Sequence, residues 1–175
     1  MTGRAAAHLP EIRAQSGTGP DMTNPESDAP FRLRFPATPA ATREAVGRVV
    51  AEMERFGTPA AWLGDVEIAL AEAFNNVAEH AYAQRPGGPV DVELRWEGER
   101  LSIEIGDDGI AFPEGCPPEG GPVDVTGPRE DLPEGGFGWL LLRSLTSGIA
   151  YDRVDGRNLL TLRFDVPRSD SDRRA

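Results

Sequence analysis

Residues 67–82, EIALAEAFNNVAEHAY, decide the fold, because they have the pattern of one amphipathic helix with a polar flank. Apolar residues recur at the i, i+3, i+4, i+7 spacing of a helix that buries one face: Val66, Ala69, Leu70, Ala73, Phe74, Val77 and Ala81. Glu72 and Asn76 lie off that face, about 40° apart around the helix axis. We therefore predict a half-buried helix that presents an acid and an amide to one bound ligand.

The composition of the whole chain is that of one globular domain. Its 175 residues, 39% hydrophobic and 27% charged, are enough to bury a sizeable core. No apolar run approaches the roughly 18 residues of a membrane span, and no signal peptide is recognised, so we expect a cytoplasmic protein that does not bind a membrane. The net charge of −11 would repel a phosphate backbone, which argues against direct nucleic-acid binding.

The segments around the central helix alternate between strand and helix patterns. Helices are expected near residues 39–56 and 138–145, and a further one opens at Thr58 and breaks at Gly64 before the central stretch. Five strands are expected, at residues 31–35, 90–96, 101–105, 149–154 and 159–166. This order predicts an α+β fold with helices on one face of a mostly antiparallel sheet.

Composition also sets the expected domain boundaries. Residues 1–29 lack hydrophobic periodicity and are predicted to form a disordered tail, as are residues 168–175. We expect one domain over residues 30–167. Within it, residues 113–136 are dominated by Gly, Pro, Asp and Glu, and a loop of this length between two glycine motifs indicates a lid.

Three clusters carry candidate chemistry, and each has a simpler explanation when taken alone. Glu72 and Asn76 also fit a solvated helix flank. The sequence DDG at 107–109, directly after a strand, is also an ordinary turn. The sequence GGFG at 135–138 is also a flexible start of a helix, although glycines there let backbone N–H groups approach a phosphate.

Together, the clusters resemble the N box and the two glycine boxes of the GHKL ATPase superfamily. NNVAEHAY at 75–82, IEIGDDGIAFP at 103–113 and the segment GGFGWLLLRSLTSGIAYDRVDGRNLLTLRF at 135–164 are similar to stand-alone anti-sigma-factor serine/threonine kinases of bacterial partner-switching systems. The resemblance covers about residues 31–166. It implies the Bergerat ATP-binding fold, a two-layer α/β sandwich whose mixed sheet is mostly antiparallel.

The resemblance also implies roles for the residues of the N box. Glu72 would be the catalytic general base, since a carboxylate can accept the proton of an attacking serine hydroxyl. Asn76 would hold Mg²⁺, for which an amide oxygen is a suitable hard ligand. His80 matches a histidine common at this point in the family, and we expect it to be structural.

The glycine boxes would hold ATP, the second implied cofactor. Asp107 matches the aspartate that hydrogen-bonds the adenine amino group in the family, and Gly109 completes that box. Asp108 is the less suitable residue for this hydrogen bond to adenine. Gly136 and Gly138 match the second box, where backbone amides near the following helix would meet the phosphates.

The function implied by the resemblance is that of an ATP-dependent protein serine/threonine kinase acting as an anti-sigma factor. It would phosphorylate an anti-anti-sigma partner of the STAS type and in its other state bind a sigma factor. A homodimer through the first strand and helix is a further expectation from the family. The alternative is a non-catalytic nucleotide-binding module that sequesters a regulatory partner.

Overall fold

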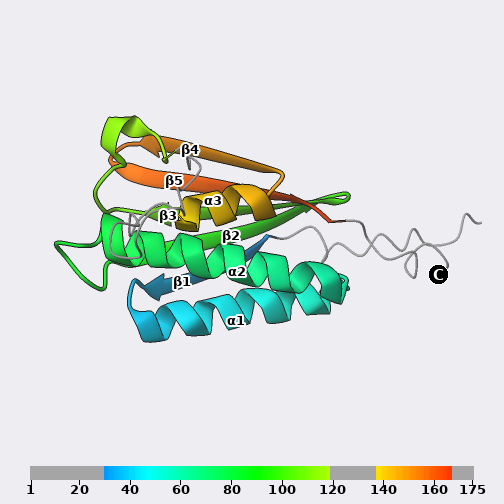
Figure 1. Cartoon of the computed structure of the whole chain (residues 1–175). Coiled ribbons are helices and arrows are strands. Elements are labelled where there is room, and N and C mark those ends of the chain that lie inside the picture. The colour runs from blue at the N-terminus through cyan, green and yellow to red at the C-terminus, as the bar shows by residue number, and fades with distance from the viewer. Residues whose placement is uncertain (1–29, 119–136, 167–175) are drawn as a thin grey trace, which may run out of the picture.

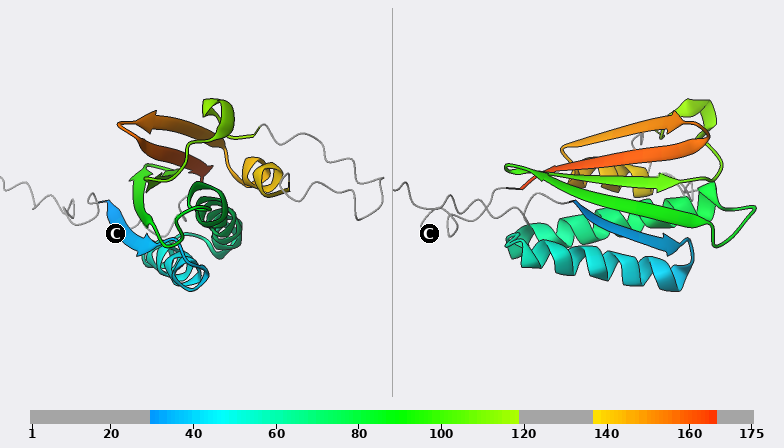
Figure 2. Two further views of the ribbon diagram at one scale, coloured as in Figure 1. Left: turned by 90° about the vertical axis from the view of Figure 1, so that its left-hand side faces the viewer. Right: turned by 180° about the vertical axis from the view of Figure 1, so that it is seen from behind.

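The computed structural model describes residues 30–118 and 137–166. Its sheet contains five strands: β1 (Phe31–Pro36), β2 (Pro89–Glu97), β3 (Arg100–Asp107), β4 (Gly148–Val154) and β5 (Arg157–Asp165). Three α-helices pack on one face: α1 (Pro39–Arg55), α2 (Ala60–Asn76) and α3 (Phe137–Leu145). No helix of the described part covers the opposite face, so the molecule has two layers (Figures 1 and 2).

The strand order is β1-β2-β3-β5-β4, which confirms the predicted α+β sandwich. Each of the pairings is antiparallel, so the described sheet is antiparallel throughout rather than mixed. The strand order leaves β1 and β4 at the edges and puts β3 and β5 side by side near the centre. Because β3 and β5 run antiparallel, the end of β3 lies beside the start of β5.

Several predictions concern residues whose placement is not described. The tails at 1–29 and 168–175 lie outside the described residues, as does Gly136 of the second glycine box. Most of the predicted lid also lies there, and only residues 113–118 are described, beginning with a 3₁₀ turn, η3 (Pro113–Gly115).

The first helix begins as its sequence predicts. Thr38 is the N-cap of α1, and its hydroxyl oxygen accepts a hydrogen bond from the Ala41 N–H at 3.4 Å. Gly57 follows the helix with φ of +73°, a conformation that glycine adopts without steric cost. β1 therefore leads into a helix that packs beside α2 (Figure 1).

The predicted break at Gly64 is wrong, because α2 runs through it without interruption. A glycine inside a helix costs only about 1 kcal/mol relative to alanine, and the buried Val66 and Leu70 that follow hold the helix on the core. The regular helix ends at Asn76 and continues as one π-helical turn, η2 (Val77–Ala81). Such turns insert one extra residue and occur often at functional sites.

The core lies between the helices and the inward residues of the central strands. Alternate positions are buried in β2, β3 and β5: Val90, Val92, Leu94, Leu101, Ile103, Ile105, Leu160, Leu162 and Phe164. The predicted apolar stripe of α2 packs on them, with Phe74 only 1% exposed. Asp155 and Gly156, at φ of +52° and +83°, form the predicted tight turn between β4 and β5.

Candidate functional site

A cavity of about 420 Å³ lies between the end of α2, the turn η2 and the adjoining ends of β3 and β5. Asn76 and His80 line it from the helix side, and Asp107 and Asn158 line it from the sheet. Apolar side chains make up most of the remaining wall. A mostly apolar cavity of this size with a few polar groups is typical of a small-molecule site.

An aromatic cluster forms one wall of this cavity. The Phe112 ring packs edge-on against Trp139 of α3, with centroids 5.2 Å apart, and against Tyr151 of β4, at 4.9 Å. Edge-to-face pairs of this kind are favourable arrangements of aromatic rings. They hold the chain after β3 against α3 and β4. The resulting wall suits a flat, apolar ligand group.

Asp107 is the buried acid of the cavity, with 4% of its surface exposed. Its Oδ1 accepts hydrogen bonds from the Gly109 N–H at 2.8 Å and from Asn158 Nδ2 at 2.7 Å. Burial raises the pKa of Asp107, and these two hydrogen bonds oppose the rise. Both bonds go to Oδ1, and no residue of the described ranges bonds Oδ2, which is therefore available as an acceptor for a ligand.

Asn158 is a polar residue of the site that the sequence analysis missed. It lies directly opposite Asp107 in the register of β3 and β5, and is 3% exposed. Its Oδ1 accepts hydrogen bonds from the Tyr151 hydroxyl at 2.7 Å and from Arg153 Nη1. Partners on both ends of the amide leave it one orientation, with the amino group toward Asp107.

A signal for Asn158 was present in the strand pattern. Asn158 shares the inward face of β5 with Leu160, Leu162 and Phe164, all of them buried. An asparagine in line with buried apolar residues needs partners for its amide. That requirement could have marked it as part of a polar site.

Gly109 allows the loop after β3 to lie against the π-helical turn. A Cβ on Gly109 would be 2.4 Å from the backbone oxygen of Ala81, a distance that no side chain tolerates. The Ile110 N–H donates to that same oxygen at 2.9 Å. The glycine is therefore required by the close approach of two backbone segments.

Tyr82, also missed from the sequence, ties this loop to the sheet. Its buried hydroxyl donates to the Pro89 oxygen at 2.7 Å and accepts from the Asp108 N–H at 2.9 Å. The π-helical turn places the ring, since the Tyr82 N–H bonds to the Val77 oxygen five residues back. Tyr82 therefore joins helix, strand and loop at one point.

Glu72, Asn76 and Gly138 meet at the other end of the site, where α3 begins. A Cβ on Gly138 would lie 2.6 Å from Glu72 Oε2 and 4.0 Å from Asn76 Nδ2. The missing side chain of Gly138 therefore makes room for the Glu72 carboxylate. The Asn76 Nδ2 atom is buried and has no hydrogen-bond partner within the described residues, which is rare unless a ligand provides one.

The structure thus brings together the described residues of all three predicted clusters. Asn76 and Asp107 line the same cavity, Glu72 and Gly138 adjoin Asn76, and Gly109 adjoins Asp107. His80, which we expect to be structural, is exposed and lines the cavity. None of the helices in the described ranges is long and apolar enough to cross a membrane.

Curated relatives and solved structures are similar to this chain. Serine-protein kinases RsbW from Bacillus cereus, Bacillus thuringiensis and Bacillus anthracis are each 33% identical over 101 residues. The alignment covers 57% of this chain and 62% of each relative, so the chain spans less than two thirds of their length.

Two solved structures share the fold at low sequence identity. One contains the RsbU and RsbW domains of a Mycobacterium tuberculosis protein, with a TM-score of 0.56, 18% identity, and coverage of 81% of this chain and 33% of that one. The other is the SiaB–SiaC complex from Pseudomonas aeruginosa, with a TM-score of 0.51, 14% identity, and coverage of 77% and 88%.

The family model of the histidine kinase-like ATPase domain matches residues 35–164. This range includes α1, α2 and α3, and contains all the residues that line the cavity. The polar residues at both ends of the cavity are therefore part of the matched domain. On this match, the chain belongs to the histidine kinase-like ATPase domain family.

Proposed function

We propose that this protein is an ATP-dependent protein serine/threonine kinase that phosphorylates an anti-anti-sigma partner of the STAS type and acts as an anti-sigma factor. The observation that carries the proposal is the placement of Glu72 and Asn76 beside Gly138, at the start of a helix that borders an apolar cavity. Similarity to serine-protein kinases RsbW supports the same assignment.

The buried end of the cavity fits adenine. Asp107 Oδ2, which has no hydrogen-bond partner among the described residues, is an acceptor of the kind that would pair with the exocyclic amino group of adenine. Guanine carries an acceptor oxygen at the corresponding ring position, and that oxygen would repel the carboxylate. The wall formed by Phe112, Trp139 and Tyr151 suits the flat ring.

The residues at the other end fit a magnesium-bound triphosphate. Asn76 supplies an amide whose buried Nδ2 has no partner in the described part of the chain. The oxygen of this amide would be one ligand of Mg²⁺, which otherwise keeps water and phosphate oxygens. When bound, Mg²⁺ would neutralise charge on the phosphates during transfer.

Glu72 has the chemistry and the position of a general base. Its Oε2 lies against Gly138 in the first turn of α3, and backbone N–H groups at a helix N-terminus favour phosphate. The carboxylate would accept the proton of the partner's serine hydroxyl while that oxygen bonds to the γ-phosphorus. The bond between the γ-phosphorus and the bridging oxygen breaks, and ADP leaves.

The test uses the whole chain, ATP, Mg²⁺ and a purified anti-anti-sigma protein of the STAS type, with phosphoserine as the readout. Glu72→Gln should lower the phosphorylation rate by about 100-fold or more while nucleotide still binds. Glu67→Gln is the matched control, because Glu67 is an exposed glutamate of the same helix. Undiminished phosphorylation by Glu72→Gln would contradict the role of Glu72 as the general base.

The same assay separates the kinase from the non-catalytic alternative. A wild-type protein that binds ATP and the partner but forms no phosphoserine would be a sequestering module. The sigma factor and the homodimer are tested by co-purification and by light scattering of the full chain. Neither result depends on the role of Glu72 in catalysis.

A further inference from the structure

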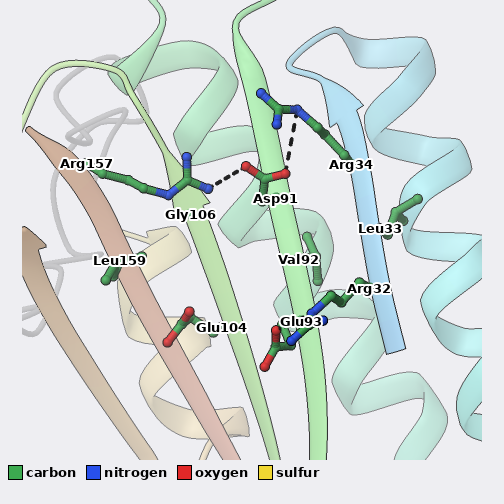
Figure 3. Close-up of a pocket in the computed structure, with 10 residues that line it drawn as sticks. All are labelled: Arg32, Leu33, Arg34, Asp91, Val92, Glu93, Glu104, Gly106, Arg157 and Leu159. Carbon is green, nitrogen blue, oxygen red and sulfur yellow. Dashed lines mark hydrogen bonds and ion pairs between the residues drawn. The ribbon is translucent and has the colours of Figure 1, made fainter. Parts of the chain in front are cut away.

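The helix-free face of the sheet carries a row of charged side chains directly behind the cavity. Arg34 of β1, Asp91 of β2 and Arg157 of β5 line a hollow of about 460 Å³ (Figure 3). Arg157 Nη2 hydrogen-bonds one oxygen of Asp91, and Arg34 Nε lies 3.6 Å from the other. Asp91 is thus held between two arginines.

Arg157 reaches Asp91 by crossing β3 above Gly106. A Cβ on Gly106 would be 2.5 Å from Arg157 Nη2, so the glycine leaves the space in which the guanidinium lies. The same guanidinium donates from Nη1 to Asp108 Oδ1 at 3.0 Å. One planar group therefore joins β5, β2 and the loop that follows β3.

Two neighbouring residues of β5 bind two neighbouring acids at the end of β3, the last residue of the strand and the first of the loop. Asn158 binds Asp107 on the helix side of the sheet, at 2.7 Å. Arg157 binds Asp108 on the open side. Because side chains alternate across a strand, the two contacts grip the end of β3 from opposite faces.

We propose that Arg157 is a positioning residue for nucleotide binding, which holds Asp108 on the open face and thereby orients the Asp107 carboxylate toward adenine. This role rests on the proposed function, since it takes Asp107 as the group that binds the base. Arg157 itself does not line the cavity. It acts through the loop from the opposite face of the sheet.

A purely structural ion pair would have a different signature. The side chains of Arg157 and Asp108 are 32% and 45% exposed, and pairs this exposed contribute little to stability. The ion pairs affect the position of the loop more than they affect stability, because a guanidinium that bonds carboxylates on two elements fixes the distance between those elements. Loss of Arg157 should therefore change base selectivity more than it changes unfolding.

The experiment measures ATP and GTP dissociation constants of the full chain by calorimetry, together with the thermal unfolding of the free protein. Arg157→Gln should weaken ATP binding by about five- to tenfold and leave GTP binding within about twofold, so that the preference for adenine falls. Arg100→Gln is the matched control. Arg100 pairs with Asp165, at 3.3 Å, at the other end of the same β3–β5 pair, and its loss should change neither constant.

Further variants distinguish positioning from folding. Arg157→Lys keeps the positive charge but not the planar, forked guanidinium group. Its preference for ATP over GTP should lie between those of the wild type and Arg157→Gln. Asp108→Ala should lower the preference for ATP to the same extent, with no further loss in the double variant. If Arg157→Gln does not fold, Asp108→Ala provides the decisive measurement.

Three results would overturn the inference. Arg157→Gln, or Asp108→Ala in its place, could keep the wild-type preference for ATP over GTP. The variant could instead bind ATP and GTP more weakly to the same extent and unfold at a lower temperature. That result would indicate a structural role. A wild-type protein that binds no adenine nucleotide would overturn the proposed function as well, whereas the first two results leave that function intact.

Discussion

Side chains on both faces of the sheet hold the end of β3, but the two faces use different interactions. On the helix side the link is a buried amide, Asn158, whose partners are all within the protein. On the open side it is an ion pair of Arg157 with Asp91 and Asp108 that water reaches. Because the first link is buried, its removal should lower the free energy of unfolding strongly. Removal of the second, exposed link should lower it only a little.

The largest expected difference between the faces is in stability. Asn158→Leu removes one of the two hydrogen bonds to the buried Asp107 carboxylate and the acceptor of the Tyr151 hydroxyl, and places an apolar side chain among these polar groups. We expect a loss of about 3 kcal/mol in the free energy of unfolding. Arg157→Gln on the open face should lose less than about 1 kcal/mol. Denaturant titration of both variants measures the contrast, and equal losses would contradict it.

Two glycines offer a smaller test of the same contrast. Gly109→Ala would drive a Cβ into the Ala81 backbone oxygen, which cannot move without shifting the π-helical turn, so we expect a loss of about 2 kcal/mol. Gly106→Ala meets only the flexible end of Arg157, at 2.5 Å. Its unfolding free energy should stay within about 0.5 kcal/mol of wild type, although ATP binding should weaken as Arg157 is displaced.

Thermal unfolding with and without ATP separates the two glycine variants. Gly109→Ala should unfold at lower temperature in both conditions. Gly106→Ala should match wild type without ATP and be stabilised less by its addition. A Gly106→Ala protein that ATP stabilises as much as wild type would contradict a link between the open face and the cavity.

The pH dependence of stability should have opposite signs on the two faces. Burial raises the pKa of Asp107 above 3.8, so its contribution is greatest at low pH and is lost as pH rises through the raised value. The hydrogen bond from Arg32 lowers the pKa of Glu93 below 4.5, so its contribution is present above that pH and is lost as pH falls through the lowered value.

Two neutral variants measure these contributions one at a time. Between pH 3 and about 7, Asp107→Asn should gain stability relative to wild type as pH rises. Glu93→Gln should lose stability relative to wild type over the same range. Chemical denaturation of the three proteins at each pH provides the comparison, and parallel curves would show that neither pKa is shifted by folding.

Much of this site was visible in the sequence because its residues lie close together along the chain. The helical spacing of residues 67–82 placed Glu72 and Asn76 on one flank, and the alternation in β2 and β3 led to the acids at the end of β3. The tight turn at Asp155 and Gly156 was predicted for the same reason, since its conformation depends on two adjacent residues.

The errors arose where tertiary contacts override local preference. Gly64 was expected to interrupt a helix, yet packing of the helix face on the core outweighs the small local cost of one glycine. The π-helical turn has no signal in the apolar pattern, because it depends on how the chain must reach Tyr82 and the loop after β3.

The sequence by itself determined the layers of the fold, the helix that carries Glu72 and Asn76, and the strand that leads to Asp107. Periodicity and turn chemistry act over a few residues, so they can be recognised from order alone. Only the tertiary structure decided that Asn158 faces Asp107, that Arg157 passes over Gly106 to Asp108, and that Gly138 makes room for Glu72. Those contacts join residues distant in the chain, and strand register and helix packing alone bring them together.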